Sequence, residues 1–369
     1  MGVWLFGLIF LFITLLQAFI PYFLKQTIVF GVYVPEQYTR TEIVTRLKKR
    51  YAISVLLWGL LIFVAFLIWL FTQRPTEDVL ALVSVGLQFA ILFVSVGYYI
   101  VSHVRMKKVK AEHRWTEGKN EVRVVDLTFQ DKVQLIPKVV FVMPMIVTIG
   151  LIIYTYMNYD KMPDLIPTHW GPSGEPDAFT GKNYFTVVLT MLILLVLQGM
   201  MLIMSEGLRF SGAKINPNQK KKSAEQQLRF RKYSSWLSLF ISVGITLMLG
   251  YFHLQTIHPE VTSSVLMMGI PLTFLIGTLL VVIIFTWKVG QGGTRLKVEE
   301  DAENIDGNTI SVDDDKYWKA GVIYINKDDP SILVEKRFGV GWSLNFAHPI
   351  GWLIFFGPLV LILILTLAL

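Results

Sequence analysis

The residues whose types could do chemistry gather in one stretch, Pro163–Asp177, which reads PDLIPTHWGPSGEPD. His169 stands beside Trp170, and the carboxylates Asp164 and Asp177 flank this pair. Imidazole and carboxylates are zinc ligands, but a single histidine with carboxylates at loose spacing is more typical of a hydrogen-bonded loop. We therefore expect no metal and no other cofactor here, and a role in binding rather than in catalysis.

No catalytic motif accompanies these residues. The sequence has no cysteine, which excludes disulfides, thiolate metal sites and cysteine nucleophiles. It also lacks a His-Glu-x-x-His pair, a Gly-x-Ser-x-Gly elbow and a Gly-x-x-x-x-Gly-Lys phosphate loop. The glycine-rich string Val289–Arg295 follows an apolar run rather than a strand, and it has no phosphate-loop lysine. We predict that the protein is not an enzyme.

Proline and glycine give Pro163–Asp177 a constrained backbone. Proline limits the entropy that a loop loses on ordering, and glycine permits turns that proline does not make. We predict a pre-shaped loop, poor in helix and strand, that recognises a peptide or a lipid headgroup. A purely structural re-entrant hairpin is the alternative. Trp170 is expected to anchor the loop at the level of the headgroups.

Long apolar runs surround this stretch and set the fold class. The 369 residues are 53% hydrophobic with a mean hydropathy of +0.54, which is too apolar for a soluble protein. A helix needs about 20 apolar residues to cross about 30 Å of hydrocarbon. The sequence therefore predicts an all-α polytopic membrane protein with about eight transmembrane helices. The predicted spans are Val3–Leu24, Tyr51–Phe71, Val79–Val101, Val139–Met157, Tyr184–Met204, Tyr233–Tyr251, Val261–Trp287 and Ile350–Leu369.

Lysine and arginine alternate between successive loops. Basic clusters such as Arg46–Arg50, Arg105–Arg114 and Lys220–Lys232 fall in odd-numbered loops, whereas the even-numbered loops carry few cations. Because cytoplasmic loops are enriched in Lys and Arg, we predict that both termini and the Pro163–Asp177 loop are extracytoplasmic. The first apolar run lacks the basic residues and cleavage site of a signal peptide, so it is expected to be retained. The net charge of +7 is attributed to loops at an anionic bilayer surface, and no direct nucleic-acid binding is expected.

Strongly polar side chains are rare in the predicted spans. Gln17, Gln88 and Gln198 are the examples, and no Asp or Glu lies in a span. Ion sites and proton relays use ionisable groups at membrane depth, so proton-coupled transport is not expected. We expect the glutamines to form interhelical hydrogen bonds rather than a substrate path.

The predicted cytoplasmic segment before the last span is long enough to form structure of its own. Strands over Gly321–Asn326 and Ser331–Lys336 are expected to pair as a small β-hairpin through the turn Lys327–Pro330. Two strands alone are marginal in water, so this hairpin is expected to pack on another loop or on the lipid surface.

The string PDLIPTHWGPSGEPD between two spans resembles the signature of a bacterial membrane family of unknown function. Its best-known members are SdpI-type immunity proteins, which protect a cell against its own secreted toxic peptide and can transmit its presence inward. The resemblance covers the loop and its flanking spans, and it implies a ligand-binding role for the loop. The implied binding residues are Pro163, Pro167, His169, Trp170, Gly174 and Asp177.

Two other segments carry further resemblances. The string FGVYVPE (Phe30–Glu36) resembles a segment common after the first span of larger relatives of that family. The segment before the last span resembles a second uncharacterised domain, found in Gram-positive bacteria. Its matched positions are Tyr317, Trp318, Asn326, Asp329, Pro330, Lys336, Arg337, Gly339, Gly341 and Asn345.

The sequence divides into a three-helix region (1–138), the signature hairpin of two helices and a loop (139–204), two further helices (205–287) and a cytoplasmic segment with the last helix (288–369). We expect a non-enzymatic protein of the bacterial plasma membrane that senses, or confers immunity to, an extracellular peptide. Its expected partners are the lipid bilayer, that peptide and a cytoplasmic transcriptional regulator. Two alternatives stay open: a transporter or flippase-like component for a peptide or lipid, and a structural or partner-docking membrane subunit.

Overall fold

The computed structural model describes residues 2–124, 128–170, 176–261, 263–298 and 309–367. Within these ranges eight helices are long and apolar enough to cross a membrane, so the predicted all-α polytopic fold is confirmed. The helices are α1 (Gly2–Phe23), α2 (Glu42–Gln73), α3 (Glu77–Glu112), α4 (Lys138–Met157), α5 (Leu189–Gly207), α6 (Lys220–Ile257), α7 (Ser264–Lys288) and α8 (Pro349–Leu367).

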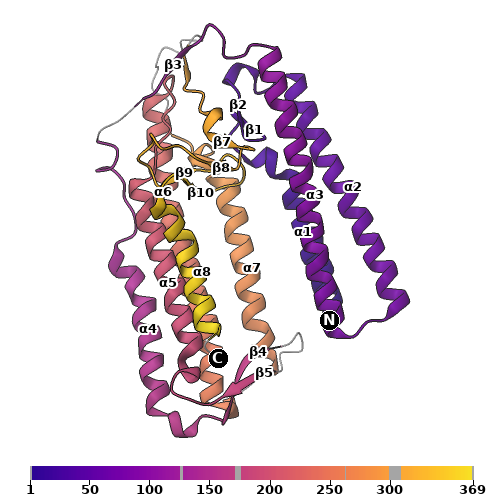
Figure 1. The fold of residues 1–369 in the computed structure, drawn as a ribbon, viewed down its shortest axis with the longest axis vertical. Helices are drawn as coiled ribbons and strands as arrows, with labels where there is room; N and C mark the ends of the chain where they lie inside the picture. Colours follow the sequence, from indigo (N-terminus) through magenta and orange to yellow (C-terminus); the bar gives the residue numbers. More distant parts are fainter. Residues whose placement is uncertain (1, 125–127, 171–175, 262, 299–308, 368–369) are drawn as a thin grey trace.

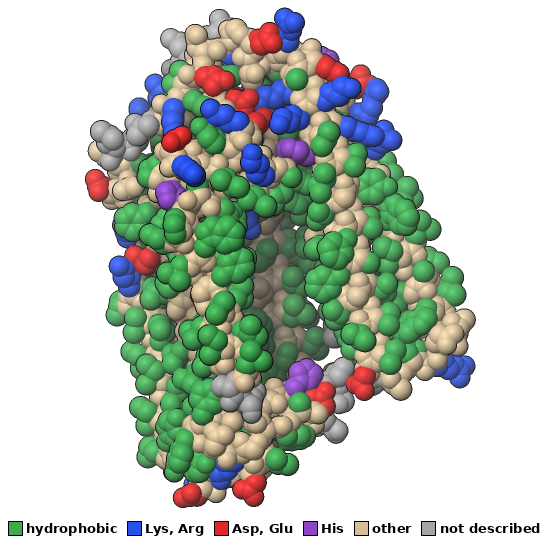
Figure 2. Space-filling model, in the orientation of Figure 1, with side chains coloured by type: hydrophobic (Ala, Val, Ile, Leu, Met, Phe, Trp, Pro, Cys, Tyr) green, Lys and Arg blue, Asp and Glu red, His purple; other side chains and the backbone are tan. Residues whose placement is uncertain are grey.

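The helices form two groups that stand side by side (Figure 1). In the first group α1, α2 and α3 pack on one another. In the second group α5 contacts α4, α6 and α8, and α6 also contacts α4 and α7. Figure 2 shows a hollow between the two groups, with hydrophobic side chains along both of its sides. The fold is therefore two helical units rather than one bundle.

Buried polar side chains connect helices within each group. In the first, Ser95 Oγ on α3 donates a hydrogen bond to Gln17 Oε1 on α1 at 2.9 Å. In the second, the buried Gln198 Nε2 on α5 lies 2.8 Å from Thr148 Oγ1 on α4 and 2.7 Å from Thr246 Oγ1 on α6. Such contacts give the Gln198 amide nitrogen and the Gln17 amide oxygen hydrogen-bond partners between helices. The predicted interhelical hydrogen bonds of Gln17 and Gln198 are confirmed.

Helix α6 is much longer than its predicted span. It has 38 residues, which is about 57 Å at 1.5 Å per residue, against about 30 Å of hydrocarbon. Most of its additional turns lie at the Lys220 end, where Lys, Gln, Glu and Arg are good helix formers. Arg229 Nε there donates to Glu225 Oε1 one turn earlier, at 2.6 Å. A single helix thus joins the two ends of the second group.

The two ends of the molecule differ in charge and in chain content. Both termini lie at the end that carries β4 and β5, and the other short strands lie at the opposite end (Figure 1). Lysine and arginine gather mainly at the end opposite to β4 and β5, which we call the basic end (Figure 2). The arrangement agrees with the predicted alternation of loops. Which end faces the cytoplasm stays a prediction from the positive-inside rule.

Short strands pair two by two along the described part of the chain. The antiparallel pairs are β1–β2, β4–β5, β7–β8 and β9–β10, and β3–β6 is parallel. Their bounds are Ile28–Val29 (β1), Val32–Tyr33 (β2), Asn120–Val122 (β3), Leu165–Trp170 (β4), Pro176–Gly181 (β5), Thr309–Ser311 (β6), Trp318–Lys319 (β7), Ile323–Tyr324 (β8), Leu333–Glu335 (β9) and Trp342–Leu344 (β10).

Small β-hairpins precede the last helix as predicted, but the predicted pairing of their strands is wrong. β8 pairs with β7 and β9 pairs with β10, so the Lys327–Pro330 turn joins two hairpins instead of closing one. The cause is a pair of tight turns that the sequence interpretation missed. Ala320 and Gly321 adopt positive φ between β7 and β8, and Gly339 and Gly341 do so between β9 and β10. We call β7–β10 with their turns and the adjoining Asn345, residues 318–345, the C-terminal β unit.

Candidate functional site

The stretch Pro163–Asp177 is part of a β-hairpin, so the expectation of a loop poor in strand is wrong. β4 and β5 run antiparallel with Pro167 opposite Phe179, and the register shifts beside His169. Proline removes one ladder donor, which an edge strand tolerates, and both strands of a two-stranded ladder are edges. The β4–β5 hairpin therefore accommodates its prolines.

Apolar contacts fix the β4–β5 hairpin to the second helix group. Ile166 packs in a buried cluster with Met162 after α4, Val187 and Val188 before α5, and Ile257 at the end of α6. Ile166 is 6% exposed and Ile257 is 2% exposed. The hairpin thus has a defined position at the ends of three helices.

Two of the implied binding residues meet on this hairpin. His169 Nδ1 lies 2.5 Å from Asp177 Oδ1 across the strands, and the side chains are 68% and 48% exposed. This contact is a hydrogen bond, and no group of three metal-ligating side chains occurs within the described ranges. Of the other implied residues, Pro163 precedes β4, Pro167 and Trp170 lie in β4, and Gly174 is outside the described residues.

At the basic end, three residues of the second resemblance form the centre of the C-terminal β unit. Asn345 Nδ2 donates to the Asn326 carbonyl at 2.7 Å, and the Asn326 backbone N–H donates to Asn345 Oδ1 at 3.0 Å. Tyr324 Oη donates to Asp329 Oδ2 at 2.9 Å. These buried side chains satisfy backbone groups of the turn between the two hairpins. Their role is to shape the C-terminal β unit.

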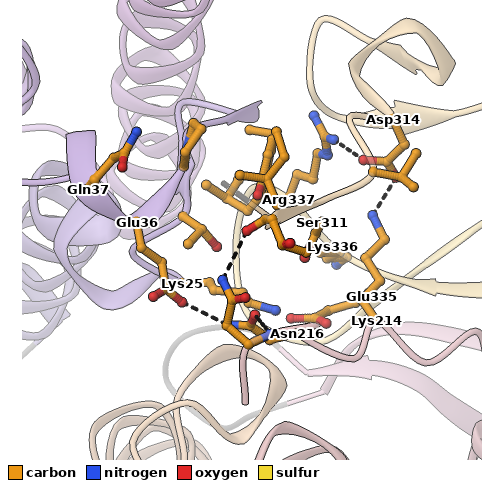
Figure 3. A pocket seen from close by; sticks show the side chains of 18 residues that line it. Lys25, Glu36, Gln37, Lys214, Asn216, Ser311, Asp314, Glu335, Lys336 and Arg337 are labelled. Carbon is orange, nitrogen blue, oxygen red and sulfur yellow. Dashed lines mark hydrogen bonds and ion pairs between the residues drawn. The ribbon is translucent and has the colours of Figure 1, made fainter. Parts of the chain in front are cut away.

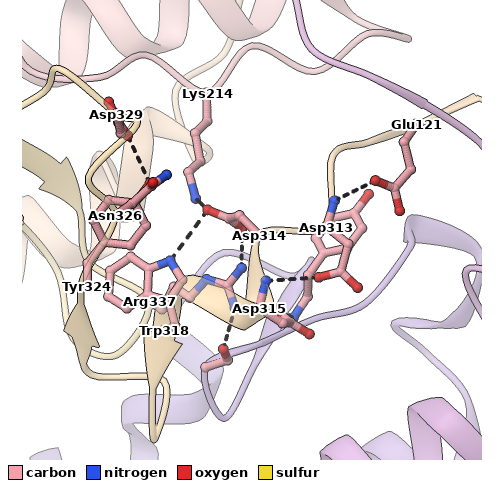
Figure 4. Close-up of polar contacts among 12 residues, drawn as sticks. Glu121, Lys214, Asp313, Asp314, Asp315, Trp318, Tyr324, Asn326, Asp329 and Arg337 are labelled. Atoms are coloured by element: carbon pink, nitrogen blue, oxygen red, sulfur yellow. Dashed lines mark hydrogen bonds and ion pairs between the residues drawn. The ribbon is translucent and has the colours of Figure 1, made fainter.

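Arg337 links the C-terminal β unit to the first helix group. Its side chain is 2% exposed and forms ion pairs with Asp314 and Asp315 (Figure 4). Its Nη1 also donates to the Gly31 carbonyl at 2.6 Å, in the turn between β1 and β2. Lys110 at the end of α3 lies 2.6 Å from Asp315 Oδ2. Segments that are hundreds of residues apart thus meet at one guanidinium.

The charges of this cluster balance within the described residues. Lys110, Lys214 and Arg337 face the three carboxylates of Asp313–Asp315, and Lys214 Nζ lies 2.5 Å from Asp314 Oδ2. We call these six residues the ion cluster. Around the buried Arg337 and Lys110, opposite charges offset the desolvation penalty that an unpaired ion would have, whereas the Lys214 side chain is 41% exposed.

Proximity to the cations keeps the carboxylates of Asp314 and Asp315 ionised. Burial alone would raise the pKa of the Asp314 carboxyl, but Lys214 and Arg337 outweigh burial and hold that pKa well below its ordinary value. Asp315 behaves in the same way, with burial opposed by Arg337 and Lys110 and a lowered pKa as the result. Burial would lower the pKa of the Arg337 guanidinium, and the two carboxylates reverse this and raise it. All three groups are charged at neutral pH.

Two glycine turns let the first loop approach the C-terminal β unit. Gly31 has φ 74° and Gly321 has φ 69°, which is the left-handed region that favours glycine. A Cβ on Gly31 would lie 2.6 Å from Gly321 Cα. His103 Nδ1 on α3 lies 2.7 Å from the carbonyl oxygen of the adjacent Phe30. The segment Phe30–Glu36 is therefore held between α3 and the C-terminal β unit.

A cavity of about 410 Å³ opens beside the ion cluster, and we call it the junction cavity (Figure 3). Its walls come from the first loop, the α5–α6 connection, β6 and the end of β9, so both helix groups contribute. Glu36 Oε1 accepts a hydrogen bond from Asn216 Nδ2 at 2.7 Å between two of these walls. Lys336, Arg337 and Asp314 also line it. The arrangement is suited to binding a small polar molecule or to fixing the two helix groups together.

The remaining positions of the second resemblance lie in the C-terminal β unit or next to it, and of these described residues only Lys336 and Arg337 line the junction cavity. The Arg337 guanidinium lies 5.3 Å from the centroid of the Trp318 ring, which is buried. Tyr317 is half-buried beside Trp318, Pro330 is exposed, Lys336 is exposed at the cavity, and Gly339 and Gly341 form the β9–β10 turn.

The sequence interpretation missed Lys110, Lys214 and Asp313–Asp315. These residues come from separate segments, so no local spacing relates them. One signal was present, because the run of three aspartates ends two residues before Tyr317, where the second resemblance begins.

Comparison with known families places one match near each end of the molecule. A domain of unknown function, DUF1648, matches residues 146–195, which include the β4–β5 hairpin. A family of unknown function, DUF5808, matches residues 327–352, which include β9 and β10. No curated protein and no solved structure matches the chain. The chain is an integral membrane protein that matches two families of unknown function, each over a short segment.

Proposed function

We propose that this protein is a non-enzymatic, SdpI-like sensor or immunity protein of the bacterial plasma membrane, and that the β4–β5 hairpin receives an extracellular peptide. Within the described residues β4 pairs only with β5, so each strand has an unpaired outer edge. Such an edge offers backbone donors and acceptors to an extended peptide. Leu165 and Phe179 are 60% and 50% exposed on the hairpin and supply apolar contact area. Their exposure, together with His169 and Asp177, suits peptide recognition.

The observation that carries the proposal is the continuity of α6. Ile257 at one end of this helix packs against Ile166 of the hairpin. Near the other end, Gln227 Nε2 donates to the buried Glu335 Oε2 of β9 at 2.8 Å. A displacement at the hairpin therefore has a rigid element through which it reaches the C-terminal β unit. A cytoplasmic transcriptional regulator that binds the basic end would complete the signal path.

A sensitivity assay tests the proposal directly. Deleting the gene is expected to sensitise the cell to a specific antimicrobial peptide, and His169→Ala or Asp177→Ala is expected to reproduce much of that loss. Asp164→Asn, an exposed position just before β4, is the matched control and should keep resistance. Membrane levels of each variant are measured in parallel. Unchanged sensitivity of the deletion strain across a broad peptide panel would contradict the proposal.

The hollow between the helix groups favours a second candidate, a transporter or flippase-like component for a peptide or lipid (Figure 2). This candidate predicts substrate movement in proteoliposomes and an impaired rate in Gln88→Leu, whose side chain lies on α3 of the first group. Retained movement without any effect on peptide sensitivity would favour transport over sensing.

A further inference from the structure

A second cavity, of about 540 Å³, adjoins the junction cavity at the basic end. The two share lining residues, among them Lys25, Glu36 and Lys214. The second cavity extends to the end of α1, to the segment after α7 that holds Gly292 and Arg295, and to the first turns of α6, so it too lies between the two helix groups. We call it the basic cavity.

Cations dominate the lining of the basic cavity. Glu36 is its one carboxylate among the described residues, and that side chain already accepts a hydrogen bond from Asn216. Lys25, Arg40 and Arg295 form no ion pair with any carboxylate in the described ranges. The five cationic lining residues are Lys25, Arg40, Lys214, Lys222 and Arg295.

Backbone carbonyl groups at the ends of α1 and α7 hold the Arg295 side chain at the basic cavity. Its Nη2 donates to the Tyr22 carbonyl of α1 at 3.0 Å, and its Nη1 lies 3.3 Å from the Trp287 carbonyl oxygen of α7. The guanidinium also lies 5.4 Å from the centroid of the Phe23 ring. A guanidinium has five N–H donors. Backbone carbonyls therefore orient Arg295 without neutralising it, and donors remain for an anion.

The ends of the adjoining helices place the basic cavity at the level of the lipid headgroups. α1 has 22 residues, about 33 Å at 1.5 Å per residue, which matches about 30 Å of hydrocarbon. Its last residues Tyr22 and Phe23 therefore mark the bilayer boundary. Trp287 near the end of α7 is 68% exposed, as is typical of aromatic side chains in this belt.

We propose that the basic cavity binds a phosphate-bearing anion, and that the headgroup of an anionic phospholipid is its source. Cations from both helix groups line this one cavity, which a general enrichment of cytoplasmic loops in Lys and Arg does not require. Basic pockets between transmembrane helices on the cytoplasmic side of a bilayer bind anionic headgroups, and the basic end is predicted to face that side. A bound phosphate would join α1 to α7 and set the spacing of the two groups. The proposal is independent of the peptide role of the hairpin.

Thermal unfolding of the full-length protein in a neutral detergent tests the proposal. Phosphatidylglycerol, phosphatidylcholine and sodium pyrophosphate are titrated separately at constant ionic strength. The cavity variant is Lys25→Gln/Arg40→Gln/Arg295→Gln, and Lys25→Gln/Arg40→Gln replaces it if the loss of Arg295 prevents folding. The matched control, Arg105→Gln/Lys107→Gln, removes two exposed cations of α3 that do not line the basic cavity.

Phosphatidylglycerol is expected to raise the Tm of the natural protein and of the control more than phosphatidylcholine does. The cavity variant should need about tenfold or more phosphatidylglycerol for the same rise, since each cation near an anionic surface contributes measurably. A rise with pyrophosphate that the cavity variant loses would support the same anion site with a soluble phosphate as its source. Equal responses of the natural protein and the cavity variant to every additive would overturn the proposal.

Discussion

The His169–Asp177 pair and the Arg337 ion pairs stand at opposite ends of the molecule and differ in exposure. His169 and Asp177 are 68% and 48% exposed, and eight residues separate them in sequence. Arg337 is 2% exposed, and it contacts Gly31, which is 306 residues away. An exposed pair contributes little to stability but stays accessible to a ligand. A charge-balanced cluster around a buried guanidinium fixes the positions of distant segments, which suits a rigid junction.

Removing Arg337 is the strongest test of this difference. Arg337→Ala leaves the largely buried Asp314 and Asp315 with one lysine each and one negative charge of the ion cluster unbalanced, so the free energy of unfolding is expected to fall by about 3 kcal/mol. The neighbouring Lys336→Ala is the control, because that side chain is exposed and its loss should change stability by less than about 0.5 kcal/mol. Thermal unfolding of both variants in detergent measures the effect. Equal Tm values would show that the ion cluster does not stabilise the junction.

A smaller loss is expected where the first loop meets the C-terminal β unit. Gly31→Ala places a side chain at φ 74° and 2.6 Å from Gly321 Cα. Gly118→Ala meets the same backbone strain at φ 70° with no neighbour within 4 Å. We expect a loss of about 1–2 kcal/mol for Gly118→Ala from the left-handed backbone alone. Gly31→Ala should lose about 1–3 kcal/mol more through overpacking, and similar Tm shifts would contradict the close approach.

Low pH is expected to reduce the stability of the basic end by a smaller amount, through Asp314 and Asp315. The lowered pKa values of Asp314 and Asp315 mean that their contribution to stability is fully present above the ordinary Asp value of about 3.9. It is lost as the pH falls below about 4 toward the lowered values of the folded state. Unfolding curves at pH 7 and pH 5 should therefore show no loss from these groups, whereas stability should fall at pH 3. Asp314→Asn should reduce the loss of stability between pH 5 and pH 3. The same loss in this variant would show that Asp314 does not cause it.

The sequence allowed the membrane helices to be predicted because hydropathy is a local property. It also allowed the Pro163–Asp177 stretch to be singled out, since both partners of the His169–Asp177 contact lie in one segment. It did not allow the ion cluster to be predicted, because Lys110, Lys214 and Arg337 meet only through the packing of separate segments. The strand pairing before α8 failed for a related reason. Short strands carry little pattern, and the positive φ values of their turns decided the pairing.

The smallest effect on stability is expected at the hairpin. His169→Ala breaks an exposed contact with Asp177, and such pairs contribute about 0–1 kcal/mol, so its Tm should stay close to that of the natural protein. If the hairpin receives a peptide, the same variant loses resistance while it stays folded. Ile166→Ala, at a 6% exposed position in the anchoring cluster, is the opposite control and should lower the Tm through a cavity. A His169→Ala protein that unfolds as readily as Ile166→Ala would make the pair a structural element. The hairpin would then resemble the ion cluster in stabilising the fold, and the proposed difference between the two ends would be wrong.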